Sequence, residues 1–138
     1  MRSMRTQSGW LVVLERGEEV VSAVTAFVKE RGVEGGQVRA IGGIANPVLG
    51  WYNLDEKRYQ KKRFEGNFEL LSLLGNVSLV GGEAFCHLHA TVAGADYVVY
   101  GGHLFEAEVS ITAEVEIRPA PRIERRDDDF TGLKLLAP

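Results

Sequence analysis

The pattern of hydrophobic and polar positions predicts one helix near the start of the chain. From Glu18 to Arg31, hydrophobic residues recur at helical spacing and fall on one face. Gly32 follows at the position where a left-handed residue commonly ends a helix. The buried face is predicted to consist of Val20, Val21, Val24, Phe27 and Val28.

The rest of the chain has the pattern of β-structure. Hydrophobic runs are separated by Gly, Asn, Asp or Pro, which favours strands joined by turns and paired antiparallel. The last run alternates most clearly, which predicts a buried face made of Val109, Ile111, Ala113, Val115 and Ile117. Strands are predicted at 9–17, 36–43, 47–54, 57–64, 67–80, 84–92, 96–102 and 107–117.

These elements predict an α+β fold: a single domain with a central, mainly antiparallel sheet and a packed N-terminal helix. Residues 1–8 are predicted to be an N-terminal extension, and residues 9–118 the folded domain. Residues 119–138 begin with two prolines and carry a mixed run of charges, which predicts an extended surface arm. The end of that arm is predicted to be held by Phe130, Leu133, Leu135 and Leu136.

Composition narrows the classes of function. The 138 residues are 45% hydrophobic and 25% charged, as in an ordinary soluble domain. A net charge of −3 gives no general attraction to nucleic acid. No hydrophobic run approaches the roughly 20 residues that span a bilayer, so no membrane partner is expected. The single cysteine, Cys86, and an N-terminus without a signal-peptide pattern favour the cytoplasm.

All three histidines lie in two neighbouring predicted strands. In "CHLHA", strand alternation places His87 and His89 on one face, opposite the hydrophobic face that includes Cys86. If the hairpin loop is centred on Ala95, His103 of "GGHL" lies directly across from His87, and the three side chains converge. A register one residue different would turn His103 to the other face.

Three neutral imidazoles are suitable ligands for a divalent transition metal, with zinc the first candidate. Three protein ligands with an open fourth position are typical of catalytic zinc sites. The alternative from the same residues is a set of hydrogen-bonded histidines in a sheet, without a metal.

Glu69 is a carboxylate within the hydrophobic run "NFELLSLLG", where it needs a partner or a proton. We expect it to hydrogen-bond a ligand histidine, to act as an acid or base, or to be a fourth ligand. The alternative is a side chain that points into solvent. Cys86 is predicted to be a small buried hydrophobic residue.

A basic segment, "KRYQKKRF", is the candidate nucleic-acid contact. Its aromatic residues are interleaved with cations, a combination that can bind phosphates and bases. The alternative is a solvated hairpin. The basic residues are Lys57, Arg58, Lys61, Lys62 and Arg63.

The ordered stretches "FVKERGVEGGQVRAIGGIANPVLGWYN", "FELLSLLGNVSL", "HLHATV" and "GGHLFEAEV" resemble the plants-and-prokaryotes conserved (PPC) domain. The resemblance implies an α+β domain that assembles as a homotrimer. Plant members follow AT-hook segments that grip the DNA minor groove, whereas this chain has no R-G-R-P hook. The PPC fold is also similar to that of acetolactate decarboxylase, whose metal is held by an H-x-H pair and a later histidine. By that motif His87, His89 and His103 match the metal ligands in order.

Two main hypotheses of function follow. The first is a homotrimeric PPC-domain binding module with a DNA-binding or regulatory role and a three-histidine metal site. The second is a metal-dependent enzyme, lyase- or decarboxylase-like, that acts on a small oxo- or carboxylate substrate. A third possibility is a structural trimer in which the metal serves assembly.

Overall fold

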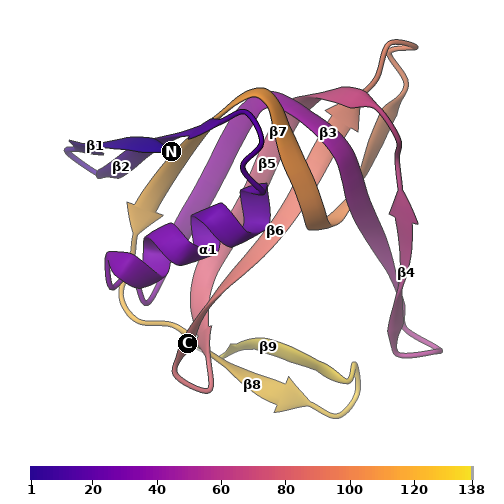
Figure 1. Cartoon of the computed structure of the whole chain (residues 1–138). Helices are drawn as coiled ribbons and strands as arrows, with labels where there is room; N and C mark the ends of the chain where they lie inside the picture. The colour runs from indigo at the N-terminus through magenta and orange to yellow at the C-terminus, as the bar shows by residue number, and fades with distance from the viewer. Residues whose placement is uncertain (138) are drawn as a thin grey trace.

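The computed structural model describes residues 1–137 and consists of one mainly antiparallel sheet with a single helix (Figure 1). The helix is α1 (Val20–Glu30). The strands are β1 (Arg2–Thr6), β2 (Gly9–Glu15), β3 (Gly36–Asn53), β4 (Arg58–Arg63), β5 (Asn67–Val80), β6 (Glu83–Ala93), β7 (Val99–Pro119), β8 (Glu124–Asp128) and β9 (Leu133–Ala137).

The sheet follows the order β1-β2-β7-β3-β5-β8-β9, with β4 paired to β3 and β6 paired to both β5 and β7. The ladders from β3 to β5, β6, β7 and back to β3 therefore form a closed circuit. Figure 1 shows how strongly the long strands β3 and β7 curve to close it. The one parallel contact among the described strands is the bridge from β5 to β8, Leu79 to Glu124. The expected single, mainly antiparallel domain is confirmed.

The helix begins and ends close to the predicted positions. The side chain of Glu19 accepts hydrogen bonds from the amides of Val21 and Ser22, which caps the first turn. Gly32 follows the helix with a φ of 64°, the left-handed conformation that was expected. The strands β1 and β2 precede the helix, so it does not open the chain. The helical part of residues 1–137 offers no segment with the length and hydrophobicity needed to cross a membrane.

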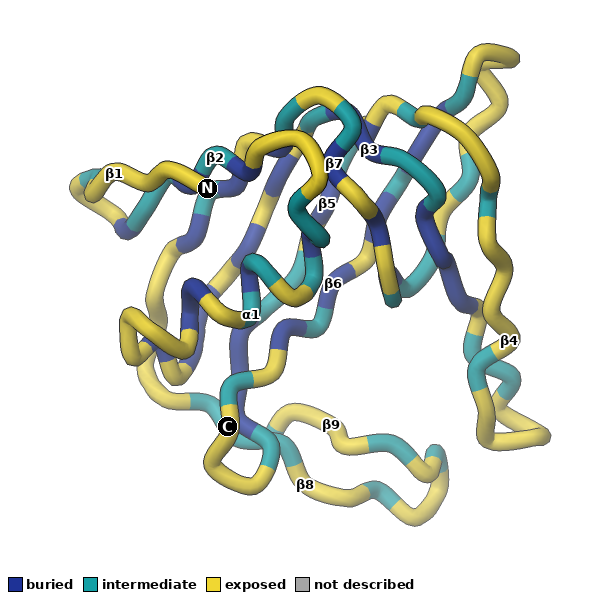
Figure 2. Tube along the Cα trace, viewed as in Figure 1, coloured by how far each residue is buried: buried dark blue, intermediate teal, exposed yellow. Residues whose placement is uncertain are grey.

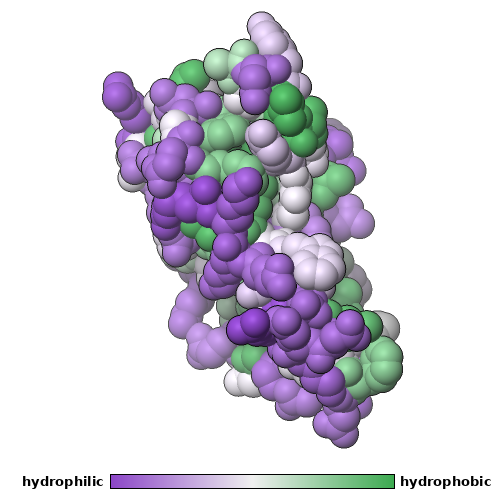
Figure 3. Space-filling view, turned by 90° about the vertical axis from the view of Figure 1, so that its right-hand side faces the viewer, coloured by the Kyte–Doolittle hydropathy of each residue, from purple (hydrophilic) through white to green (hydrophobic). Residues whose placement is uncertain are grey.

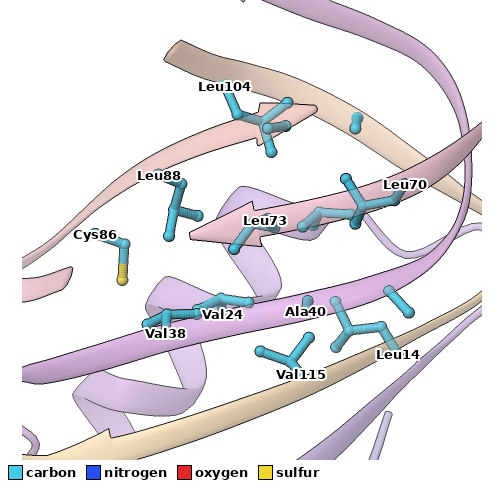
Figure 4. Packing of buried hydrophobic residues seen from close by; sticks show 14 of the residues in the cluster. Leu14, Val24, Val38, Ala40, Leu70, Leu73, Cys86, Leu88, Leu104 and Val115 are labelled. Atoms are coloured by element: carbon cyan, nitrogen blue, oxygen red, sulfur yellow. The ribbon is translucent and has the colours of Figure 1, made fainter. Parts of the chain in front are cut away.

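The core lies between α1 and the inner face of the sheet. In Figure 2 the buried segments are on α1 and the strands behind it, while β4, β8 and β9 are largely exposed. Figure 4 shows Val24 of the helix near Val38, Leu73 and Leu88 of three different strands. Burying such branched and aliphatic side chains is the main source of stability in a domain of this size.

Two parts of the sheet differ from the predicted pattern. The predicted strands at 36–43 and 47–54 form the single strand β3, which ends at Asn53, and those at 96–102 and 107–117 both fall in β7, which begins at Val99. Ile111 was expected in the core but is 69% exposed. Its strand is irregular there: Gly42 and Ile44 are two residues apart on β3, whereas their partners on β7, Ala113 and Val109, are four apart. This bulge turns Ile111 outward.

Both chain ends belong to the sheet more fully than predicted. Residues 2–6, expected in an extension, form β1 and pair with β2. The expected extended arm is instead a hairpin, β8–β9. Its turn contacts the β3–β4 hairpin, where Tyr52 donates to the carbonyl of Thr131 at 2.5 Å and Lys57 to that of Asp129 at 2.7 Å. Phe130, expected to help hold the arm, is 74% exposed.

Candidate metal centre

His87 and His89 project from the outer face of β6, as predicted from alternation. The residues between and beside them, Cys86 and Leu88, are 7% and 0% exposed and point into the core (Figure 4). Burial raises the pKa of the Cys86 thiol, so it stays protonated and behaves as a buried hydrophobic residue. This strand therefore separates its two functions by face: packing on one side and imidazoles on the other.

The third histidine joins them through the pairing of β6 with β7. His103 lies opposite His89, whereas the predicted register placed it opposite His87. That prediction was wrong by two residues along the strand. Because side chains alternate with a period of two, this shift leaves His103 on the same face, and convergence is preserved. The ring centroids are 4.9 Å apart for His87 and His89, 5.0 Å for His87 and His103, and 5.5 Å for His89 and His103.

The three imidazoles have the spacing of a site that is able to hold a metal ion. One ring nitrogen from each of His87, His89 and His103 lies within 4.8 Å of the others. The Nε2 atoms of His87 and His89 are 3.1 Å apart. Two ligands on tetrahedral zinc, each about 2.0–2.1 Å from the metal, are separated by roughly 3.3 Å. The spacing of His87 and His89 thus fits a zinc-like ion. The His103 ring completes the site by moving closer to the other two.

Two of these imidazoles are neutral at physiological pH. Burial, with the charge of Arg125 and the neighbouring His89, lowers the pKa of His87 to about 4. Burial and the surrounding positive groups also lower the pKa of His103 to about 4. Because a metal binds the neutral imidazole, such histidines are available as ligands without losing a proton. The Nδ1 atom of His103 is buried and has no hydrogen-bond partner within residues 1–137.

Arg125, which the sequence analysis did not single out, reaches this site from β8. Its guanidinium donates to Ser78 Oγ at 2.8 Å, to Asn76 Oδ1 at 2.9 Å and to the Lys134 carbonyl at 2.9 Å. Its Nη2 atom also lies 3.2 Å from Nδ1 of His87. Local sequence patterns do not predict this contact, because Arg125 and His87 are 38 residues apart.

The Arg125 contact determines which nitrogen of His87 carries the proton. A guanidinium can only donate, so Nδ1 of His87 accepts and its proton is on Nε2. Ligation through Nε2 would move the proton to Nδ1, where it would face another donor. Metal binding through Nε2 of His87 and the Arg125–His87 hydrogen bond therefore exclude one another.

A pocket of about 420 Å³ opens beside the histidines. Its walls come from β4, the end of β5, β6, β7 and the β8–β9 hairpin, and no acidic residue contributes to them. Tyr59 and Phe105 pack around the His103 ring, with centroids 4.9 Å and 4.6 Å from it. The lining residues are Tyr59, Val80, Phe85, His87, His103, Phe105, Arg125, Gly132, Leu133, Lys134 and Leu135.

Glu69 does not join this group. It pairs with Ala93 at the other end of the β5–β6 ladder, five residues from Leu74, the partner of His89. That separation is roughly 16 Å along a strand. Glu69 is exposed and lines a different hollow with Arg16 and Glu108. Within one chain, its position does not support the expected role as a ligand, acid or base for the histidines.

The basic residues at 57–63 do not form one continuous surface. Successive side chains of β4 point to opposite faces. Lys61 therefore lies over the Phe105 ring, 3.7 Å from its centroid, whereas Lys62 lies over the Phe64 ring, 4.7 Å from its centroid. These aromatic residues are on different sides of β4. In Figure 3, which faces the edge of the molecule where β4 lies, hydrophilic side chains are interrupted by hydrophobic ones.

Most of the remaining basic groups there are already paired. Arg58 contacts Glu56 at 2.6 Å and Arg63 contacts Glu106 at 2.7 Å. Lys57 donates to a backbone carbonyl of the C-terminal hairpin. Close-range pairing thus neutralises two of the five basic residues, and within residues 1–137 the charge left for a phosphate backbone is that of Lys57, Lys61 and Lys62.

The fold and site define a single-domain, mainly β protein with a group of three histidines beside a pocket. The chain belongs to the Plants and Prokaryotes Conserved (PCC) domain family, whose model matches residues 1–121. This confirms the predicted PPC resemblance. The match includes residues 1–8, which had been placed outside the domain, and it ends before the β8–β9 hairpin.

Solved structures share the whole fold. A presumed DNA-binding protein from Bacteroides thetaiotaomicron is 30% identical, with a TM-score of 0.95 over 99% of this chain and 96% of that one. A metal-containing protein from Archaeoglobus fulgidus is 37% identical, with a TM-score of 0.88 over the full length of both chains.

The likeness to acetolactate decarboxylase is more distant. A Staphylococcus aureus protein of unknown function, described as similar to that enzyme, is 18% identical with a TM-score of 0.55. It covers 78% of this chain and 51% of its own. This match supports the fold alone. No match is found among proteins with curated descriptions.

Proposed function

We propose that this PCC-domain protein binds a divalent transition metal, with zinc the first candidate, through His87, His89 and His103. The observation that carries the proposal is the convergence of three ring nitrogens within 4.8 Å on one face of the sheet. The metal-containing relative from Archaeoglobus fulgidus, matched over its full length, supports it.

Once the Arg125–His87 hydrogen bond is released, the chain's own residues would hold such an ion rigidly and leave one side open. His87 and His89 are set by one strand and His103 by its neighbour, so the backbone ladder fixes their spacing. Tyr59 and Phe105 limit the movement of the His103 ring. When bound, a divalent metal in such a site polarises an oxygen of its ligand or lowers the pKa of a bound water.

Elemental analysis of untagged protein tests this proposal. We expect about one equivalent of transition metal per chain after zinc loading and desalting, and a loss of that metal in His89→Ala. His89 is exposed, so the substitution should leave the fold intact. Thr91→Ala, on the same strand and face, is the matched control. Metal-free protein after loading, or unchanged metal in His89→Ala, would refute the proposal.

A DNA-binding or regulatory role is the second proposal, favoured by the relative described as a presumed DNA-binding protein. Its contact would be the segment 57–63. If it is correct, a mobility-shift titration shows complexes at low salt whose affinity falls steeply as salt rises. An absence of binding at low salt would contradict it.

A homotrimer is proposed for either role. In support, a hydrophobic groove crosses the outer face of the sheet and includes Leu11, Ile41 and Leu74. Ile41 and Leu74 are 56% and 61% exposed in the single chain. Sedimentation velocity should give a trimer, and Leu74→Asp should shift it toward the monomer. A wild-type monomer at micromolar concentration would refute this assembly.

A further inference from the structure

The histidine pocket contains positive charge that no acidic residue balances. Arg125 is partly buried and forms no ion pair within residues 1–137; its hydrogen bonds are to Ser78, Asn76, His87 and a carbonyl, and it lies over the Phe85 ring. Lys61 lies over the Phe105 ring at the pocket wall and also has no carboxylate partner among the described residues. A partly buried charge without a counter-ion is costly, which favours an anion as its partner.

The body of the same pocket is hydrophobic. Tyr59, Phe85 and Phe105 line it from the sheet, and Leu133 and Leu135 line it from the C-terminal hairpin. A volume of about 420 Å³ is in the range of pockets that enclose small organic molecules. A ligand that matches the pocket therefore has a charged end and a hydrophobic body.

We propose that this pocket binds a small organic carboxylate, whose charged group contacts Arg125 and whose hydrophobic part packs between the aromatic rings and the hairpin leucines. Arg125 has five N–H groups, and the four hydrogen bonds above leave one on Nη1 free for a carboxylate oxygen. The proposal rests on the proposed function in that the metal and the anion share one site, but the contact with Arg125 requires no metal.

Part of the pocket that would recognise the ligand lies outside the family match. The PCC model ends at residue 121, whereas Arg125, Leu133 and Leu135 belong to β8 and β9. The histidines lie within the matched region. The hairpin thus supplies the charged contact of the proposed ligand site, and the domain matched by the family model supplies the histidines and the aromatic rings.

Calorimetric titration of metal-free, full-length protein with benzoate and with benzamide tests this inference, because the two probes share a shape and differ in charge. We expect benzoate to bind at least about tenfold more tightly than benzamide. Arg125→Gln should weaken benzoate binding at least about tenfold, the loss of a charge-assisted contact. Arg125→Lys should fall between, since it keeps the charge and loses the planar fork.

Arg126→Gln is the matched control, because it removes the same charge from an exposed neighbour on β8 and should change affinity less than twofold. Lys61→Gln is a second variant that leaves the hairpin contacts of Arg125 intact, and it should weaken benzoate binding severalfold. Failure of wild-type protein to bind benzoate, equal binding of the two probes, or unchanged affinity in both Arg125→Gln and Lys61→Gln would overturn the inference.

Zinc titrations on the same samples keep this result separate from the proposed function. Benzoate binding that depends on Arg125, without any metal binding, would refute the metal site and leave the anion site standing. Stoichiometric metal binding with no preference for benzoate over benzamide would refute the anion site and leave the metal site standing.

Discussion

The histidine pocket and strand β4 are neighbours that both carry several positive groups, yet they differ in how those charges are balanced. On β4, Arg58 and Arg63 each have a carboxylate within 2.7 Å, whereas Lys61 at the pocket wall has none among residues 1–137. In the pocket, Arg125 has none within residues 1–137. A cluster of cations in a sequence is therefore weak evidence of a binding site, because the fold decides which of those charges have a carboxylate partner.

The largest expected effect of any single substitution is on metal binding. His103→Ala removes one of three ligands and should weaken zinc binding by more than about 100-fold, since losing even a hydrogen-bond partner of a ligand costs 10–100-fold. Competition with a chromophoric chelator measures this. Lys62→Ala, on the side of β4 away from the pocket, is the control and should bind zinc as the wild type does. Comparable zinc affinities for His103→Ala and Lys62→Ala would show that the pocket histidine contributes no more to zinc binding than the β4 lysine does.

Removal of Arg125 should have opposite effects on the two ligands of the pocket. Arg125→Gln eliminates a positive charge and provides a side-chain carbonyl that can accept from Nδ1–H of His87, so zinc should bind roughly tenfold more tightly. The same variant should bind benzoate more weakly. Arg63→Gln, which breaks an exposed ion pair on β4, should change neither affinity by more than twofold. A fall in zinc affinity in Arg125→Gln would show that the guanidinium supports the metal.

Acid should destabilise the metal-free protein through the pocket histidines. The pKa of His87 and of His103 is about 4 in the folded chain, against about 6.5 when unfolded. Between these values the unfolded chain binds more protons than the folded chain. The contribution of these two histidines to the free energy of unfolding is therefore fully present above about pH 6.5 and is lost as the pH drops toward 4. Thermal unfolding from pH 7 to 4, compared with His103→Gln, isolates the effect. A difference between the two proteins that does not vary with pH would contradict this prediction.

The smallest expected effect is the loss of an ion pair on β4. Arg63→Gln removes the contact with Glu106, and both side chains are about half exposed. Exposed pairs of this kind contribute about 0.2–1 kcal/mol, so the free energy of unfolding should fall by less than about 1 kcal/mol. Urea denaturation measures it, and Arg126→Gln gives the baseline for removing an exposed arginine. A larger loss would show that β4 depends on its charges for folding.

Much of the fold and the histidines of the site were predictable because they depend on local pattern. The helix and its glycine end follow from helical spacing at Val20, Val24 and Phe27, and the two faces of β6 follow from alternation. Ile111 was mispredicted because a bulge is invisible to a period of two. Glu69 was expected near the histidines, but it pairs at the opposite end of the β5–β6 ladder. A hydrophobic pattern predicts a strand without predicting which end of its neighbour each residue lies beside.

The sequence by itself determined that His87 and His89 share a face and that His103 belongs to a nearby strand. It could not determine the hairpin register, and the conclusion survived only because the error was an even number of residues. The tertiary structure alone decided that Arg125, 38 residues away, reaches His87, and that the hairpin leucines line the pocket. The physical reason is that alternation and helical period act over a few residues, whereas a pocket forms from strands brought together by closure of the whole sheet.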